Sequence, residues 1–165
     1  MAPDNRPSGS LHAMRRVVVC GSMTFYGIMI RLREQLVAEG VEALLPNAET
    51  HFLESTSQDQ FETIRHAFSR NHIRRIRNPL TYGILVANFD KHGIRDYIGP
   101  STFAEIAIAA VHGKKVFVFN EFPTVYEDEL SLWRAEALHG RLERLIDLYR
   151  QACLRPIRQF NMFAA

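Results

Sequence analysis

The stretch Asp96–Asn120, DYIGPSTFAEIAIAAVHGKKVFVFN, contains a turn, a helix and a strand in succession. Gly99 and Pro100 predict where the helix begins, because proline is favoured at the first helical position. The run KVFVFN is typical of a strand that a parallel sheet buries on both faces. Glu105 is the one charged side chain within the apolar helical run. Carboxylates are rarely buried unless something pairs with them or uses them, so Glu105 is the first candidate for function.

The rest of the chain continues the alternation of strands and helices. Further apolar strands are predicted at VVVC before Gly21, at VEALLP and at YGILVANFD. Helical spacing predicts helices over residues 23–40, about 58–77, and 127–151, the last as one or two helices with a break near Gly140. This order predicts a small, doubly wound (Rossmann/flavodoxin-like) α/β fold, with a parallel sheet of four to five strands and helices on both faces.

Length and composition favour one ordinary globular domain. The chain has 165 residues, of which 47% are hydrophobic and 23% charged, and its formal charge is +2. That charge is too small to indicate a nucleic-acid polymer as partner, and no apolar run approaches the ~20 residues of a membrane span. We expect residues 1–14 to be a flexible leader without a signal peptide, 15–150 a single α/β domain, and 151–165 a tail. The tail either packs on a partner subunit or is disordered.

The cysteines and histidines form no pattern that predicts a metal or a disulfide. Cys20 and Cys153 are isolated, and His66 and His72 are six residues apart, which does not place them on one helical face. Cys20 is interpreted as a core thiol that ends the first strand. We therefore expect no metal and no cofactor, and a reducing, cytoplasmic location.

Ligands of such sheets bind at the carboxyl ends of the strands, so the loops there are the candidate binding segments. After the first strand, Gly21, Ser22 and Met23 open a turn whose N–H groups can meet an anion at the start of a helix. Met23 breaks the GxGxxG dinucleotide pattern. The alternative that this segment is only a tight turn has equal weight.

The loop after the third strand is rich in polar groups, among them Asn88, Asp90 and Asp96. Beyond it, Ser101 and Thr102 stand one turn before Glu105, so the hydroxyls and the carboxylate are expected to share a helix face. Two interpretations of Glu105 remain open. It is either a functional carboxylate, which we favour, or a buried acid satisfied by a cap or an arginine.

Taken in order, VVVCGSM, ILVAN and YIGPSTFAEIAIAAVHGKKVFVF resemble the nucleoside 2-deoxyribosyltransferase-like proteins. That superfamily includes nucleoside deoxyribosyltransferases and nucleoside 5′-monophosphate N-glycosidases. The resemblance implies that Glu105 is the nucleophile that attacks the anomeric carbon of a sugar. It also implies a homodimer or a higher homo-oligomer.

Further site residues follow from this resemblance. Donors are needed to keep Glu105 ionised, and a carboxylic acid is needed to assist the leaving base. Ser22 with Ser101 resembles the phosphate-holding pair of the monophosphate hydrolases. The predicted residues are, as catalytic groups, Glu105, Asp90, Asp96 and Tyr26, and, for substrate binding, Gly21, Ser22, Met23, Asn88, Gly99, Ser101 and Thr102.

The choice between hydrolase and transferase stays open, as do the sugar, the base and the need for a 5′-phosphate. Three other functions also stay open. One is a phosphoribohydrolase of the cytokinin-activating type, the second a nucleotide-binding sensor without catalysis, and the third an assembly subunit whose helix face around Glu105 is an interface.

Overall fold

The computed structural model describes residues 15–47 and 69–155. The predicted leader, the first part of the helix expected over 58–77 and most of the predicted tail lie outside these ranges. Within them, no helix is both long and apolar enough to cross a membrane.

Five parallel strands form one sheet, in the order β2-β1-β3-β6-β7. Their bounds are β1 (Arg16–Gly21), β2 (Glu42–Leu44), β3 (Thr81–Ala87), β6 (Lys115–Val118) and β7 (Glu136–Ala137). The central pair, β1 and β3, is in register with Val18 opposite Ile84 and Cys20 opposite Val86. The apolar runs become central strands because both of their faces are covered.

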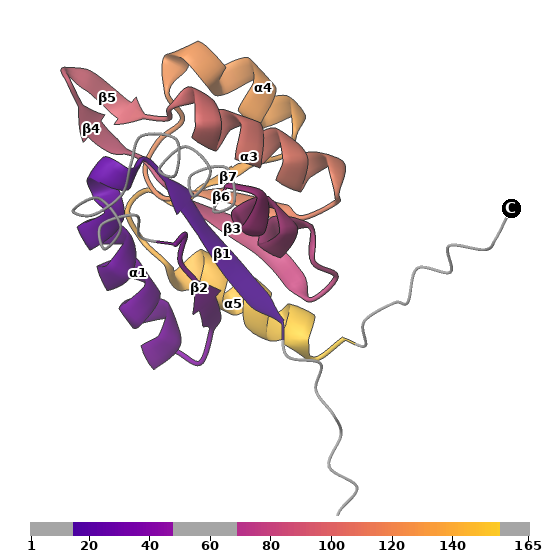
Figure 1. The fold of residues 1–165 in the computed structure, drawn as a ribbon. Helices are drawn as coiled ribbons and strands as arrows, with labels where there is room; N and C mark the ends of the chain where they lie inside the picture. Colours follow the sequence, from indigo (N-terminus) through magenta and orange to yellow (C-terminus); the bar gives the residue numbers. More distant parts are fainter. Residues whose placement is uncertain (1–14, 48–68, 156–165) are drawn as a thin grey trace, which may run out of the picture.

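Helices cover both faces of the sheet, which confirms the doubly wound α/β prediction (Figure 1). One layer holds α1 (Tyr26–Ala38) and α5 (Glu143–Cys153). The other holds α3 (Pro100–Val111), α4 (Glu127–Leu132) and the helical residues 69–77. Short 3-10 turns precede α1 and α4, at η1 (Met23–Phe25) and η2 (Thr124–Tyr126).

Alternation along β1 decides which side chains meet which layer. Val17 and Val19 pack in the core cluster beneath α1 and α5, whereas Val18 and Cys20 pack in the cluster beneath α3. Successive strand residues point to opposite faces, so this division follows from the pleat alone. Cys20 therefore lies on the same side of the sheet as Glu105.

The chain reverses its direction of winding between β1 and β3. From β1 it passes through α1 to β2 at one edge, and from β3 it passes through α3 to β6 in the other direction. Open α/β sheets bind ligands outside the carboxyl ends of the strands at such a switch point. The switch point thus directs attention to the segments that follow Gly21 and Ala87.

The segment after β3 is more regular than the loop we expected. Residues 89–97 form an antiparallel hairpin of β4 (Phe89–Lys91) and β5 (Ile94–Tyr97), which projects beyond the carboxyl edge of the sheet (Figure 1). His92 and Gly93 connect the strands with φ of 52° and 76°. Two central residues with positive φ are characteristic of a tight type I′ hairpin turn. These strands are too short for alternation to reveal them.

The C-terminal region also differs from the predicted pair of helices. The expected break is present, but it contains the fifth strand, β7, which pairs with β6 through two residues. Leu138 follows β7 and is buried against α5, which fixes the crossing from one face of the sheet to the other. The last helix, α5, ends at Cys153, two residues beyond its predicted end.

Candidate functional site

Glu105 lies in the second turn of α3, close to the carboxyl edge of the sheet. The helix begins as predicted, with Pro100 in its first turn and Gly99 as the extended N-cap residue. An added Cβ at Gly99 would come within 3.0 Å of the Tyr97 hydroxyl, so a larger residue would require the Tyr97 side chain to shift. Gly99 and Pro100 fix where the helix that carries Glu105 begins.

Two residues from other elements contact Glu105. His72 Nε2, from the helical segment 69–77, is 3.8 Å from Glu105 Oε1. The same nitrogen is 3.4 Å from Sγ of Cys20, which lies near the end of β1. The sulfur, nitrogen and oxygen all lie within 4.8 Å of one another. Residues 20, 72 and 105 are thus one cluster, which no spacing along the sequence reveals.

Burial dominates the electrostatics of this cluster. Cys20 is fully buried, His72 is 6% exposed and Glu105 is 20% exposed. Burial raises the pKa of Glu105 to about 7, although a hydrogen bond with the Cys20 thiol opposes part of the rise. Burial also raises the pKa of Cys20, an effect that the nearby Glu105 carboxylate increases. A carboxyl with such a pKa exchanges its proton near neutrality, which is common at functional sites.

His72 does not act as a cation toward Glu105. Burial lowers the pKa of His72 to about 4, and the positive charge of Arg75 adds to this effect. The imidazole is therefore neutral at pH 7, and the 3.8 Å contact is not an ion pair there. The three side chains predicted to donate hydrogen bonds to Glu105 lie in different surroundings. Thr102 is buried and Ser101 is exposed. Tyr26 packs against the core on the α1 side of the sheet, opposite the layer that contains Glu105.

Ser22 lies beside the positive charge of Lys91, a neighbour that was not predicted from the sequence. Lys91 Nζ, from the hairpin, donates a hydrogen bond to Ser22 Oγ at 3.0 Å. Ser22 Oγ in turn is 3.3 Å from Thr24 Oγ1, while Met23 is exposed beside them. A lysine and two hydroxyls just before the start of α1 can hold an anion.

Gly21 is required because β1 and β3 approach closely where both strands end. A Cβ at this position would lie 2.9 Å from the carbonyl oxygen of Ala87. The small residue that sequence reasoning connected with anion binding thus has a packing role, whichever ligand the site takes.

The two aspartates of the hairpin have different surroundings. Asp90 is exposed, and its Oδ1 accepts a hydrogen bond from the Asp96 backbone N–H at 3.0 Å. Asp96 is buried, with φ of 51° and with Arg95 Nε 3.5 Å from its Oδ2. Burial raises the pKa of Asp96, although Arg95 opposes the rise.

Asn88 holds the loops of β3 and β6 together. Its Oδ1 accepts from the Asn120 backbone N–H at 2.9 Å, and its Nδ2 donates to the Glu121 carbonyl at 2.7 Å. The Asn88 carbonyl accepts from Asn120 Nδ2 at 2.6 Å. The Asn88 side chain is fully buried, and its amide is occupied by these contacts.

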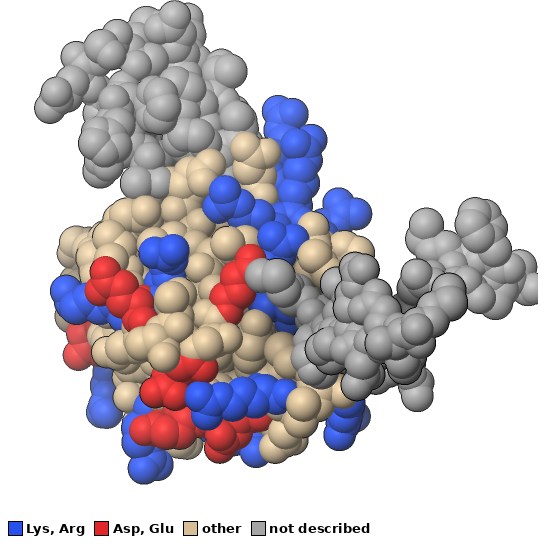
Figure 2. All heavy atoms as spheres, turned by 90° about the horizontal axis from the view of Figure 1, so that it is seen from below, with Lys and Arg blue, Asp and Glu red and all other residues tan. Residues whose placement is uncertain are grey.

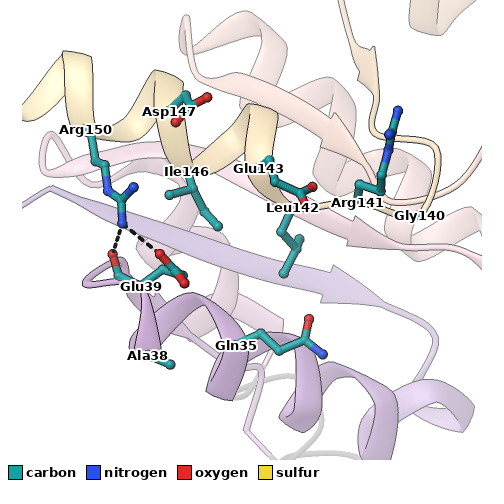
Figure 3. A pocket seen from close by; sticks show the side chains of 10 residues that line it. All are labelled: Gln35, Ala38, Glu39, Gly140, Arg141, Leu142, Glu143, Ile146, Asp147 and Arg150. Atoms are coloured by element: carbon teal, nitrogen blue, oxygen red, sulfur yellow. Dashed lines mark hydrogen bonds and ion pairs between the residues drawn. The ribbon is translucent and has the colours of Figure 1, made fainter.

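A separate hollow of about 460 Å³ lies between α1 and α5 (Figure 3). Arg150 reaches across it to the carbonyl and carboxylate oxygens of Glu39, at 3.1 and 2.8 Å. Both helices belong to the layer opposite α3, so this hollow is not part of the Glu105 site.

Basic and acidic side chains intermingle on the face of the molecule shown in Figure 2.

Comparison of the chain with protein-family models, with curated proteins and with solved structures gave no match to any of them.

Proposed function

We propose that the protein cleaves or transfers the N-glycosidic bond of a nucleoside or a nucleoside 5′-monophosphate, with Glu105 as nucleophile. The observation that carries this proposal is the position of Glu105. It is a partly exposed carboxyl in an otherwise apolar helix, at the switch point of a doubly wound sheet. The resemblance of the chain to nucleoside 2-deoxyribosyltransferase-like proteins supplies the reaction class.

Nucleophilic attack on the sugar requires an ionised carboxylate beside the anomeric carbon. As the bond from this carbon to the base nitrogen breaks, positive charge develops on the sugar and a Glu105 oxygen forms the new bond to the carbon. Glu105 must lose its proton first, because its pKa is near 7 in the free protein. An adjacent sugar that becomes positively charged favours the ionised form.

The departing base needs a proton, and Asp96 is the group we assign to this step. Its raised pKa keeps more of it protonated than an ordinary aspartate, as a general acid requires. Water or a second base then attacks the anomeric carbon from the side that the first base left, gives its proton to the Asp96 carboxylate, and releases Glu105. Water makes the protein a hydrolase, and a base makes it a transferase.

Lys91 and Ser22 favour a 5′-monophosphate as the substrate. Lys91 Nζ lies 3.0 Å from Ser22 Oγ, in the loop directly after β1. The same strand contains Cys20, which contacts His72 in the Glu105 cluster. A phosphate between the lysine and the hydroxyl would gain charge-assisted hydrogen bonds, whereas a bare 5′-hydroxyl would gain little from the cation.

Release of free base from ribo- and deoxyribonucleosides and their 5′-monophosphates tests the proposal. We expect release by the wild type and a loss of about three orders of magnitude or more in Glu105→Gln, with binding retained. Glu34→Gln, an exposed carboxylate on α1, is the matched control and should keep full activity. Equal release by wild type and Glu105→Gln would refute the role of Glu105. Binding by both without release would indicate a nucleotide sensor instead.

A further inference from the structure

Cys20, His72 and Glu105 present three different ligand atoms to one small region of the core. The sulfur comes from β1, the nitrogen from the helical segment 69–77 and the oxygen from α3. The Sγ–Nε2 distance is 3.4 Å and the Nε2–Oε1 distance is 3.8 Å. The glycosidic mechanism assigns no step to the imidazole and uses the thiol only as a hydrogen-bond partner of Glu105, so it does not explain why three such ligand atoms meet.

These distances are close to those between the ligands of a tetrahedral metal ion. A Zn²⁺ ion holds sulfur at about 2.3 Å and nitrogen or oxygen at about 2.0–2.2 Å, which places its ligand atoms roughly 3.3–3.6 Å apart. The pair formed by Cys20 and His72 already has this separation. Glu105 Oε1 is 3.8 Å from His72 Nε2 and within 4.8 Å of Cys20 Sγ, so this side chain, the most exposed of the three, has to move toward both of them to complete the site.

The orientation of the imidazole suits a metal ligand. Nε2 of His72 faces both Cys20 and Glu105, while Nδ1 is buried without a hydrogen-bond partner in residues 15–47 and 69–155. Nε2 is therefore the ring nitrogen that can ligate a metal shared with Cys20 and Glu105, in the tautomer that carries its proton on Nδ1.

Charge balance favours a divalent cation. Loss of the thiol proton and of the carboxyl proton gives two negative ligands beside one neutral ligand, and a doubly charged ion brings their sum to zero. A buried site tolerates such a neutral sum far better than an unpaired charge. A thiolate and an imidazole select zinc-like ions over Mg²⁺ or Ca²⁺, which prefer oxygen ligands.

We propose that Cys20, His72 and Glu105 form a binding site for Zn²⁺, with the fourth coordination position open on the Glu105 side. Binding forms the Zn–S, Zn–N and Zn–O bonds and releases the thiol proton, and any carboxyl proton, to solvent. A consequence that rests on the proposed function is inhibition, because a carboxylate held by zinc cannot attack a sugar.

Cobalt provides the direct test, because Co²⁺ occupies zinc sites and shows a charge-transfer band when a thiolate binds it. The full-length, metal-free protein is titrated with Co²⁺ and then with Zn²⁺. We expect a thiolate-to-Co²⁺ band that saturates at one ion per chain and disappears when Zn²⁺ displaces the cobalt.

Matched cysteine variants assign the site. Cys20→Ser should lose the band, whereas Cys153→Ser, which removes the half-buried cysteine of α5, should keep it. Glu105→Gln is the variant of the three that disturbs the core least, because Glu105 is the most exposed of the three side chains. It should weaken Zn²⁺ binding at least about tenfold. Zn²⁺ should also raise the Tm of the wild type and of Cys153→Ser, and not that of Cys20→Ser.

No thiolate band in the wild type would overturn the proposal, and so would a band that Cys153→Ser abolishes. Undiminished Zn²⁺ affinity in Glu105→Gln would do the same. These measurements use no substrate, so their failure is distinct from the failure of the glycosidase proposal. A protein that binds Co²⁺ through Cys20 and releases no base keeps the metal site and loses the proposed function.

Discussion

Lys91 Nζ donates a hydrogen bond to Ser22 Oγ across 3.0 Å, which joins the β4–β5 hairpin to the loop after β1. The hairpin thereby places a positive charge beside the loop after β1, where the proposed function would place a substrate phosphate. The same ammonium also stands 5.0 Å from the centre of the Tyr97 ring, which helps to hold it in this position.

Replacement of Lys91 by methionine should weaken the use of 5′-monophosphates and spare nucleosides. A charged hydrogen bond of about 1.5–3 kcal/mol corresponds to a loss of roughly 10- to 150-fold in kcat/KM for the monophosphate. Steady-state base release from matched nucleoside and monophosphate pairs measures it. Lys115→Met, at the amino end of β6, is the control. An equal loss on both substrates would show that Lys91 does not recognise phosphate.

Asp96→Asn should slow the release of ordinary bases and have less effect on a chemically activated leaving group. The substitution keeps the shape of the side chain, and asparagine tolerates the positive φ of this position. Loss of a general acid typically costs about 10²–10⁴-fold, but a leaving group that needs no proton avoids this cost. Asp128→Asn, exposed on α4, is the control. Equal losses on both leaving groups would exclude acid catalysis by Asp96.

Two glycines allow a matched test of the close approach between β1 and β3. Gly21→Ala should lower the free energy of unfolding by about 1–3 kcal/mol, because the new methyl group meets the Ala87 carbonyl oxygen at 2.9 Å. Gly27→Ala, in α1 with nothing within 4 Å of its Cβ, should raise stability by about 0.5–1 kcal/mol. Urea unfolding of both variants measures the difference. The same sign in both would contradict the predicted clash.

Asn88→Ala should destabilise the protein through the loops it joins. The change leaves the Asn120 N–H and the Glu121 carbonyl without their partner, at a cost of about 2–4 kcal/mol in the free energy of unfolding. Asn71→Ala, at an exposed position, should change stability by less than about 0.5 kcal/mol. A similar small effect of Asn88→Ala in urea unfolding would mean that water replaces these contacts.

The fold could be predicted where long apolar runs alternate with helical periods. The strand before Gly21, the start of α3 at Pro100 and the end of α1 before Gly40 all follow from local chemistry, and Gly40 has the expected positive φ of 78°. The two residues of β7 are too few to form a pattern. They are a strand only because β6 lies beside them.

The candidate site could be predicted only in part. Glu105 is conspicuous because its helix is otherwise apolar, but its neighbours are not close in sequence. Cys20 resembles a core thiol, and His72 occupies an apolar stripe of its helix. Their meeting depends on three elements that pack on one face of the sheet. A usable signal was present, since each of the three is a metal-binding residue type at a position that faces the core.

Trapping a covalent intermediate tests the central claim most directly. The protein is mixed with a nucleoside 5′-monophosphate from the release panel, quenched in acid during turnover and measured by intact and peptide mass spectrometry. We predict a fraction of the chain that is heavier by one sugar phosphate, with the added mass on Glu105 and absent from Glu105→Gln. Base release with the adduct on another residue, or undiminished release by Glu105→Gln, would contradict the account.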